Sequence, residues 1–211
     1  MKTNDLISLL AEDTPVTMRL GRRMTLALLI GTVASVGLLL STIGMRHNMA
    51  DAIETARVLF KIGVTLVLAI AASSLVFRIG RPGVPLLMRV LALVIPLILV
   101  IGAISMEMMM TPSNSWAARM VGNHAPFCIF FIPILSIAPL TGFMIALRNG
   151  APENPGLAGA AAGLAAGGIA AAIYAWHCPD DSPFFVATWY TIGIAIVTLI
   201  GYVIGRRLLR W

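Results

Sequence analysis

Charged residues are scarce in this sequence. Only 11% of its 211 residues are charged, whereas 59% are hydrophobic and the mean hydropathy is +0.93. Soluble globular proteins carry about 25% charged residues and roughly 45–50% apolar residues. The shortage of charge therefore excludes an ordinary soluble domain and predicts a membrane protein.

Long polar segments are also missing, which leaves no room for a soluble domain. Six apolar stretches reach or approach the roughly 20 residues that a helix needs to cross a bilayer core about 30 Å thick. We predict an all-α integral membrane bundle of six transmembrane helices over residues 24–44, 58–77, 86–106, 127–147, 156–176 and 186–205. Residues 1–23 form a short lead-in, and residues 24–211 form one membrane domain.

Ionisable residues are almost absent from the interiors of these stretches. Lys61 and Arg89 lie near predicted helix ends, where their side chains can reach the interface, and Glu107 ends the third stretch. Transporters and membrane enzymes usually carry ionisable groups at mid-membrane depth. We therefore expect a protein that is not an enzyme.

A transporter of a small solute or a metal stays an alternative. Its path would use the glycine-rich fifth stretch and the methionine-rich segment 106–110. Methionine thioethers bind soft copper(I), but methionine also fills irregular apolar gaps, which is its commoner use.

Basic residues do not form a stripe with interleaved aromatic side chains. The net charge of +6 therefore does not predict nucleic-acid binding. Eleven of the 15 lysines and arginines fall on the side of the predicted bundle that holds both chain termini. Because cytoplasmic loops carry an excess of Lys and Arg, we predict that both termini are cytoplasmic.

The lead-in contains a short amphipathic pattern. On a helical wheel over residues 4–12, an apolar arc holds Leu6, Leu9 and Leu10, and the opposite arc includes Asp5. A helix of about ten residues is marginal in water and needs a surface to bind. Since its polar face is acidic, a protein partner is favoured over anionic lipid; docking onto its own bundle is the other alternative.

The fifth apolar stretch has small residues at four-residue spacing: Gly159, Gly163, Gly167 and Ala171. Small residues on one face let two helix backbones approach closely within a membrane. We interpret the pattern as helix packing, with a pore or substrate passage as the alternative.

Pro96, Pro133 and Pro139 are expected to interrupt the third and fourth stretches. We interpret the resulting kinks as a feature of helix packing and not of mechanism.

Both cysteines are predicted at the same rim of the membrane. Cys128 opens the fourth stretch, four residues after His124, and Cys178 follows His177 in the segment WHCPDD. Two thiols and two imidazoles suit zinc, cadmium or a similar thiophilic ion if they converge. A reversible sensor, a permanent disulfide and unrelated apolar fillers are the three alternatives. Asp180 and Asp181 are expected to be solvated loop residues.

Several motifs together resemble the negative regulator of sigma-F (NrsF-like) family of bacterial inner-membrane anti-sigma factors. The resemblance spans essentially the whole chain and is carried by TNDLISLLAEDTPV, RLGRRM, PFC, WHCPDDSPFFVATWY and GRRLLRW. It implies that Cys128 and Cys178 sense heavy metal or oxidant. It also implies that the N-terminal segment around Asp5, Leu6, Leu9 and Leu10 binds an extracytoplasmic-function sigma factor.

The expected function is therefore that of a transmembrane anti-sigma factor that releases its partner when the external cysteines react. No obligatory cofactor is expected, although a thiophilic metal ion can bind transiently at the cysteines. Besides the transporter, a structural membrane subunit with a permanent disulfide is an alternative. The sequence does not determine the oligomeric state.

Overall fold

Residues 19–210 are described in the computed structural model, and this part of the chain is helical without strands. The predicted amphipathic helix over residues 4–12 lies outside the described residues. The elements are α2 (Leu20–Thr42), α3 (Met49–Ala52), α4 (Ala56–Ile79), α5 (Leu87–Ala92), α6 (Val94–Met110), η1 (Ser113–Ser115), α7 (Trp116–Val121), α8 (Ala125–Leu147), α9 (Pro155–Tyr174), α10 (Pro183–Phe185), η2 (Val186–Tyr190) and α11 (Thr191–Leu208).

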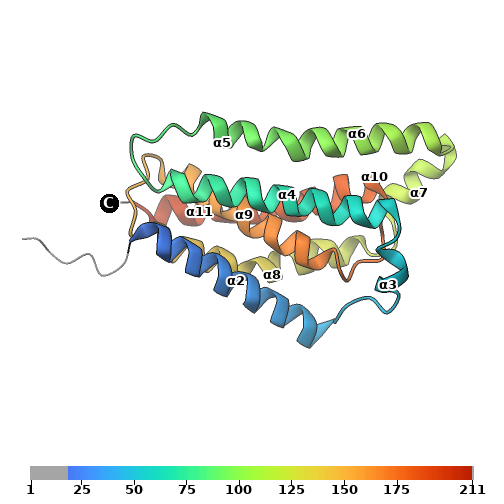
Figure 1. The fold of residues 1–211 in the computed structure, drawn as a ribbon, viewed down its shortest axis with the longest axis horizontal. Coiled ribbons are helices and arrows are strands. Elements are labelled where there is room, and N and C mark those ends of the chain that lie inside the picture. The colour runs from blue at the N-terminus through green and yellow to red at the C-terminus, as the bar shows by residue number, and fades with distance from the viewer. Residues whose placement is uncertain (1–18, 211) are drawn as a thin grey trace, which may run out of the picture.

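Six segments of 20 to 26 residues are long and apolar enough to cross a membrane, which confirms the six predicted helices. They run alternately up and down the bundle (Figure 1). One end, here called the arginine end, holds the start of α2, the end of α4 and the end of α11. The opposite end, here called the cysteine end, holds the start of α8 and the loop after α9.

The helix α9 forms the centre of the bundle and packs against α4, α8 and α11. In the most apolar stretch of 18 residues in this helix, 83% of the residues are buried. A Cβ atom added at Gly159 would lie 2.2 Å from the carbonyl oxygen of Gly201, and one at Gly163 would lie 2.5 Å from that of Val197. Gly167 is less crowded, because an added Cβ would lie 3.3 Å from the nearest atoms of Ile194. The glycine stripe thus lies where α9 and α11 approach backbone to backbone.

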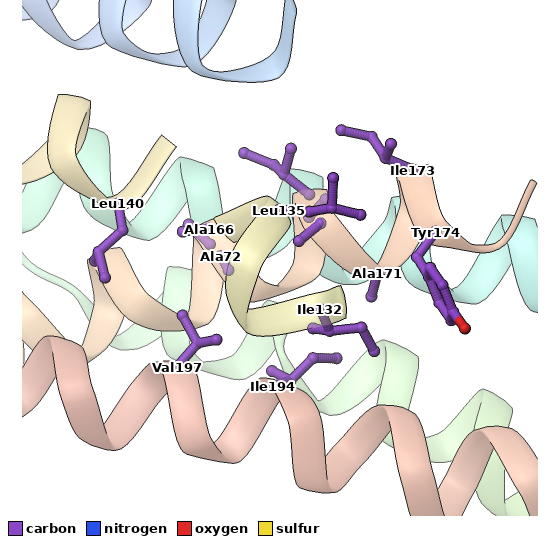
Figure 2. Packing of buried hydrophobic residues seen from close by; sticks show 14 of the residues in the cluster. Ala72, Ile132, Leu135, Leu140, Ala166, Ala171, Ile173, Tyr174, Ile194 and Val197 are labelled. Atoms are coloured by element: carbon purple, nitrogen blue, oxygen red, sulfur yellow. The ribbon is translucent and has the colours of Figure 1, made fainter. Parts of the chain in front are cut away.

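Side chains from four helices fill the core around α9. Figure 2 shows Ala72 and Ala166 in the same buried cluster as Ile132 and Ile194. These residues come from α4, α9, α8 and α11 respectively. The alanines leave room for the larger side chains of the flanking helices, so one continuous core joins the four helices.

Prolines affect the third and fourth spans differently. The third span breaks between α5 and α6 at Leu93, because Pro96 has no N–H to donate to the carbonyl of Ala92. The helix α8 continues through Pro133 and Pro139. At Pro139 the missing donor would leave the carbonyl of Leu135 unpaired, but the hydroxyl of Ser35 on α2 donates to it at 2.6 Å.

The third span lies at the edge of the bundle. Only 6% of the residues in its most apolar 18-residue stretch are buried, whereas 50% are buried in the corresponding stretch of α4 beside it. In Figure 1, α5 and α6 run along the top of the molecule and are set apart from α8 and α9. Most of the apolar surface of this segment is therefore left uncovered by the other described helices.

Candidate functional site

The candidate site lies in the loop between α9 and α10, residues 175–182. After α9 ends at Tyr174, the backbone N–H groups of His177 and Cys178 both donate to the Tyr174 carbonyl oxygen, at 2.9 and 3.1 Å. This turn directs Cys178 back toward the bundle. Pro179 and Pro183 then keep the chain from continuing as a helix until α10 begins.

The turn places Cys178 beside Cys128, which lies in the first turn of α8. The side chains of both residues are free thiols, and neither residue has measurable solvent exposure. Two cysteines separated by fifty positions in the sequence are thus adjacent and inaccessible at the cysteine end. A reagent reaches them only if the loop 175–182 moves.

Aromatic rings surround the thiols. Tyr174 stacks on Phe131 with ring centroids 6.0 Å apart and packs at the same distance against Tyr190. Tyr190 also meets Phe185 edge-on at 6.4 Å. Tyr190 is almost fully buried, and its hydroxyl has no hydrogen-bond partner among the described residues. Tyr174 neighbours Cys128 and Tyr190 neighbours Cys178, so buried aromatic side chains lie next to the thiol pair.

The surroundings of Cys178 favour its thiolate. The neighbouring Cys128 thiol, acting as a hydrogen-bond donor, lowers the pKa of Cys178 below its usual value. Burial opposes this effect, while the positive charge of Lys61 and the hydrogen bonding with Asp180 support it. Because the thiolate is the nucleophile and the metal ligand, Cys178 is the reactive member of the pair.

The two histidines have other partners. The ring nitrogen Nδ1 of His124 lies 3.1 Å from the carboxylate of Asp180, and that of His177 lies 3.0 Å from the carbonyl oxygen of Gly44. Within residues 19–210, no three or more His, Cys, Asp or Glu side chains are grouped to hold a metal ion. In this arrangement the two thiols are the side chains that could bind a metal ion. Two sulfur ligands suit a soft ion of low coordination number.

The structure corrects the expectation for Lys61. Its ammonium is not exposed but is fully buried beneath the loop. It donates to the carbonyl oxygens of Cys178 at 2.7 Å and Asp180 at 3.3 Å, and it forms an ion pair with Asp181. A lysine within an apolar helical segment is rarely without a role, and that rarity was the signal for it in the sequence.

The expectation that Asp180 and Asp181 are solvated was also wrong. Their side chains are only 17% and 18% exposed. Asp180 accepts hydrogen bonds from the backbone N–H groups of Asn123 and His124 at 3.1 and 2.9 Å. Asp181 bridges Lys61 and Arg46, the latter at 2.9 Å. The two carboxylates therefore fix the loop to the rest of the cysteine end.

A second ionic cluster lies next to the loop. Glu107, which is buried, accepts hydrogen bonds from Arg57 and Arg119, each at 2.9 Å at the shortest. A polar cavity of about 660 Å³ opens between this cluster and the loop, lined by both arginines and by Asp180 and Asp181 among others. It gives water and small solutes a path to the outer surface of the loop, with the thiols beneath.

The sequence was compared with known proteins. It matches the family described as Negative regulator of sigma F over residues 9–211. It is 33% identical over 216 residues to the anti-sigma-F factor NrsF of Caulobacter vibrioides, and 29% identical over 213 residues to a probable anti-sigma-F factor NrsF of Azospira oryzae. Both alignments cover 100% of each chain. No solved structure matches.

The family is regulatory and not enzymatic, which confirms the prediction that the protein is not an enzyme. The recognised motifs and the family match agree over nearly the whole length of the chain. This chain therefore belongs to the negative regulator of sigma F (NrsF) family, whose named members are anti-sigma factors.

Proposed function

We propose that this chain is a six-span anti-sigma factor of the bacterial inner membrane that releases an extracytoplasmic-function sigma factor when Cys128 and Cys178 react. The observation that carries the proposal is the pair of adjacent free thiols buried at one end of the bundle. The arginine end faces the cytoplasm by the positive-inside rule, so the thiols face the oxidising exterior.

Two reactions at the thiol pair fit this site. A two-electron oxidant joins the two sulfur atoms in a disulfide, and two protons and two electrons leave the thiols for the oxidant. Alternatively, a thiophilic ion such as cadmium or zinc binds both sulfurs and displaces their protons. Either reaction alters the contact between α8 and the loop 175–182, on which the packing of the cysteine end depends.

The response requires that the metal or the bond favour one conformation over another, because a ligand shifts an equilibrium only by its differential affinity. In the closed arrangement the thiols are inaccessible. The stimulus therefore reacts with an opened state and stabilises it. Residues 1–14, with Asp5, Leu6, Leu9 and Leu10 as the proposed contacts, hold the sigma factor until then.

The cysteine pair is tested by replacing both residues with serine. We expect repression of a sigma-dependent reporter to persist in Cys128→Ser/Cys178→Ser, while induction by cadmium or by a thiol oxidant is lost. The two single variants separate the stimuli, since one thiol cannot close an intramolecular disulfide. Full induction in the double variant would refute the sensor.

The N-terminal contact is tested by deleting residues 2–14. The reporter should become constitutively active although the protein still inserts. As a matched pair, Leu6→Ala/Leu9→Ala/Leu10→Ala should release the sigma factor, whereas Asn4→Ala/Ser8→Ala on the other helix face should retain it. Co-purification of the sigma factor with the deleted protein would eliminate this segment as the contact.

The transporter is less well supported. It requires polar residues at similar depths in several spans. In the described residues the two buried charged side chains, Lys61 and Glu107, lie near the cysteine end and are paired there. Labelling of thiols in intact cells without reductant separates the sensor from a structural subunit, because a permanent disulfide leaves no free thiol to label.

A further inference from the structure

Lys61 uses all of its hydrogen-bonding capacity on the loop that carries Cys178. Its ammonium has three N–H donors, and its partners are the carbonyl oxygens of Cys178 and Asp180 and the carboxylate of Asp181. The two carbonyls flank Pro179, and neither belongs to a helix. The loop is thus held at three points by one side chain of α4.

The lysine side of this contact is buried. The Lys61 side chain has no solvent exposure, whereas the Asp181 side chain is 18% exposed, so water does not reach the ammonium in the closed arrangement. Opening the loop while the ammonium stays in place would leave a buried charge without compensation, which is strongly unfavourable. Movement of Cys178 and movement of the outer end of α4 are therefore linked.

The other end of α4 reaches the start of α2. Gly80, the residue after α4, accepts a hydrogen bond from Ala151 at 3.0 Å. Its backbone is so close to its neighbours that an added Cβ would lie 3.3 Å from the side chains of both Leu20 and Leu147. Leu20 is the first residue of α2, and five residues separate it in the sequence from residues 1–14, the segment proposed to bind the sigma factor.

The helix between these two contacts is continuous. It has 24 residues, and hence a length of about 36 Å, and it packs against α9 along its course. At Ala69 the two backbones are close enough that a Cβ on Gly168 would lie 3.1 Å from the Ala69 Cα. A packed helix of this kind moves as a unit and can connect the two ends of the bundle.

We propose that Lys61 is a positioning residue that latches the Cys178 loop over the thiols, and that α4 carries the release of this latch to the start of α2. The coupling part of the proposal rests on the proposed anti-sigma function. The latch itself does not, because it concerns only access to the thiols.

The latch is tested by the rate at which a membrane-permeant maleimide labels Cys128 and Cys178 in intact cells, a measurement that does not depend on which side of the membrane the thiols face. Lys61→Met keeps an unbranched apolar chain but removes every donor to the loop. We expect labelling about tenfold faster or more than in the wild type, because the closed loop loses a buried charged contact. Arg57→Met is the control on the same helix, since it removes a positive charge four positions away whose ion pair is with Glu107 and not with the loop.

A second variant covers the case in which Lys61→Met does not accumulate in the membrane. Asp181→Asn removes the ion pairs of Asp181 with Lys61 and with Arg46, but leaves the two hydrogen bonds from Lys61 to carbonyl groups. It should also speed labelling, by a smaller factor. Labelling at the wild-type rate in the folded Lys61→Met protein, or in Asp181→Asn where Lys61→Met does not fold, would overturn the latch.

The coupling is tested in the same strains by the amount of sigma factor that co-purifies with the protein without any stimulus. Lys61→Met should retain less than Arg57→Met. Faster labelling with unchanged retention would overturn the role of α4 while leaving the latch intact. If the wild type itself binds no sigma factor, the proposed function fails, and the labelling rates still decide the latch.

Discussion

At the scale of single residues, the reactivity of Cys178 is set by its neighbours. The Cys128 thiol and the Lys61 ammonium lower its pKa against the opposing effect of burial. The resulting contribution to the free energy of unfolding is complete above the usual pKa of a thiol and is lost as the pH falls through the lower pKa of the folded state. Reactivity and stability therefore depend on the same interactions.

Removing the first of these neighbours should change the pH dependence of alkylation. In Cys128→Ala, the pH at which Cys178 reacts at half its maximal rate with iodoacetamide should rise by about one unit, which is the size of one lost hydrogen bond. Peptide mapping by mass spectrometry measures the reaction at Cys178 alone. Cys128→Ser retains a donor and should shift the profile less; an equal shift in both variants would contradict the assigned cause.

At the scale of helices, the contact between α9 and α11 depends on the absence of side chains. The backbones approach so closely that Gly159, Gly201 and Gly205 each face backbone atoms of the other helix. Gly63 on α4 has nothing within 4 Å of an added Cβ. The same substitution therefore has opposite consequences at the two kinds of position.

Gly159→Ala should lower the stability of the bundle by about 1–3 kcal/mol through overpacking. Gly63→Ala should leave stability unchanged or raise it by up to about 1 kcal/mol, because alanine has the higher helix propensity. Unfolding of the purified protein in detergent compares the two variants. Equal stabilities would show that α9 and α11 do not pack as closely as described.

At the scale of the whole molecule, the distribution of arginines predicts the orientation. The arginine end holds Arg78, Arg148, Arg206 and Arg207 near the ends of α4, α8 and α11. At the cysteine end, Arg46, Arg57 and Arg119 are instead held in ion pairs with Asp181 and Glu107. Because the arginine end carries more basic side chains than the cysteine end, the positive-inside rule predicts that it faces the cytoplasm.

Fusions should report this orientation directly. Green fluorescent protein joined after Trp211 should be fluorescent, and alkaline phosphatase joined there should be inactive, because both outcomes are typical of a cytoplasmic position. Alkaline phosphatase joined after Asn114, between the third and fourth spans, should be active. The reverse pattern would place the thiols in the cytoplasm and would contradict the sensor as proposed.

Some of the site could be predicted from the sequence because it depends on chain direction alone. Two spans separate Cys128 from Cys178, so both had to lie at the same end of the bundle. The burial of Lys61 and of the two aspartates could not be predicted in this way. It depends on which helix lies under the loop 175–182, and a position near a helix end is compatible with either a lipid-facing or an inward-facing side chain.

The sequence by itself determined six helices and their alternating direction, because a span requires only length and apolar composition, which are local properties. The tertiary structure alone decided that Cys178 turns inward to Cys128, that both histidines bond elsewhere and that Lys61 holds the loop. These facts depend on helix rotation and on contacts between residues more than fifty positions apart, such as Lys61 and Asp181. Packing between helices fixes them; the glycine stripe predicts that α9 packs closely, but no local pattern specifies which helices lie beside it.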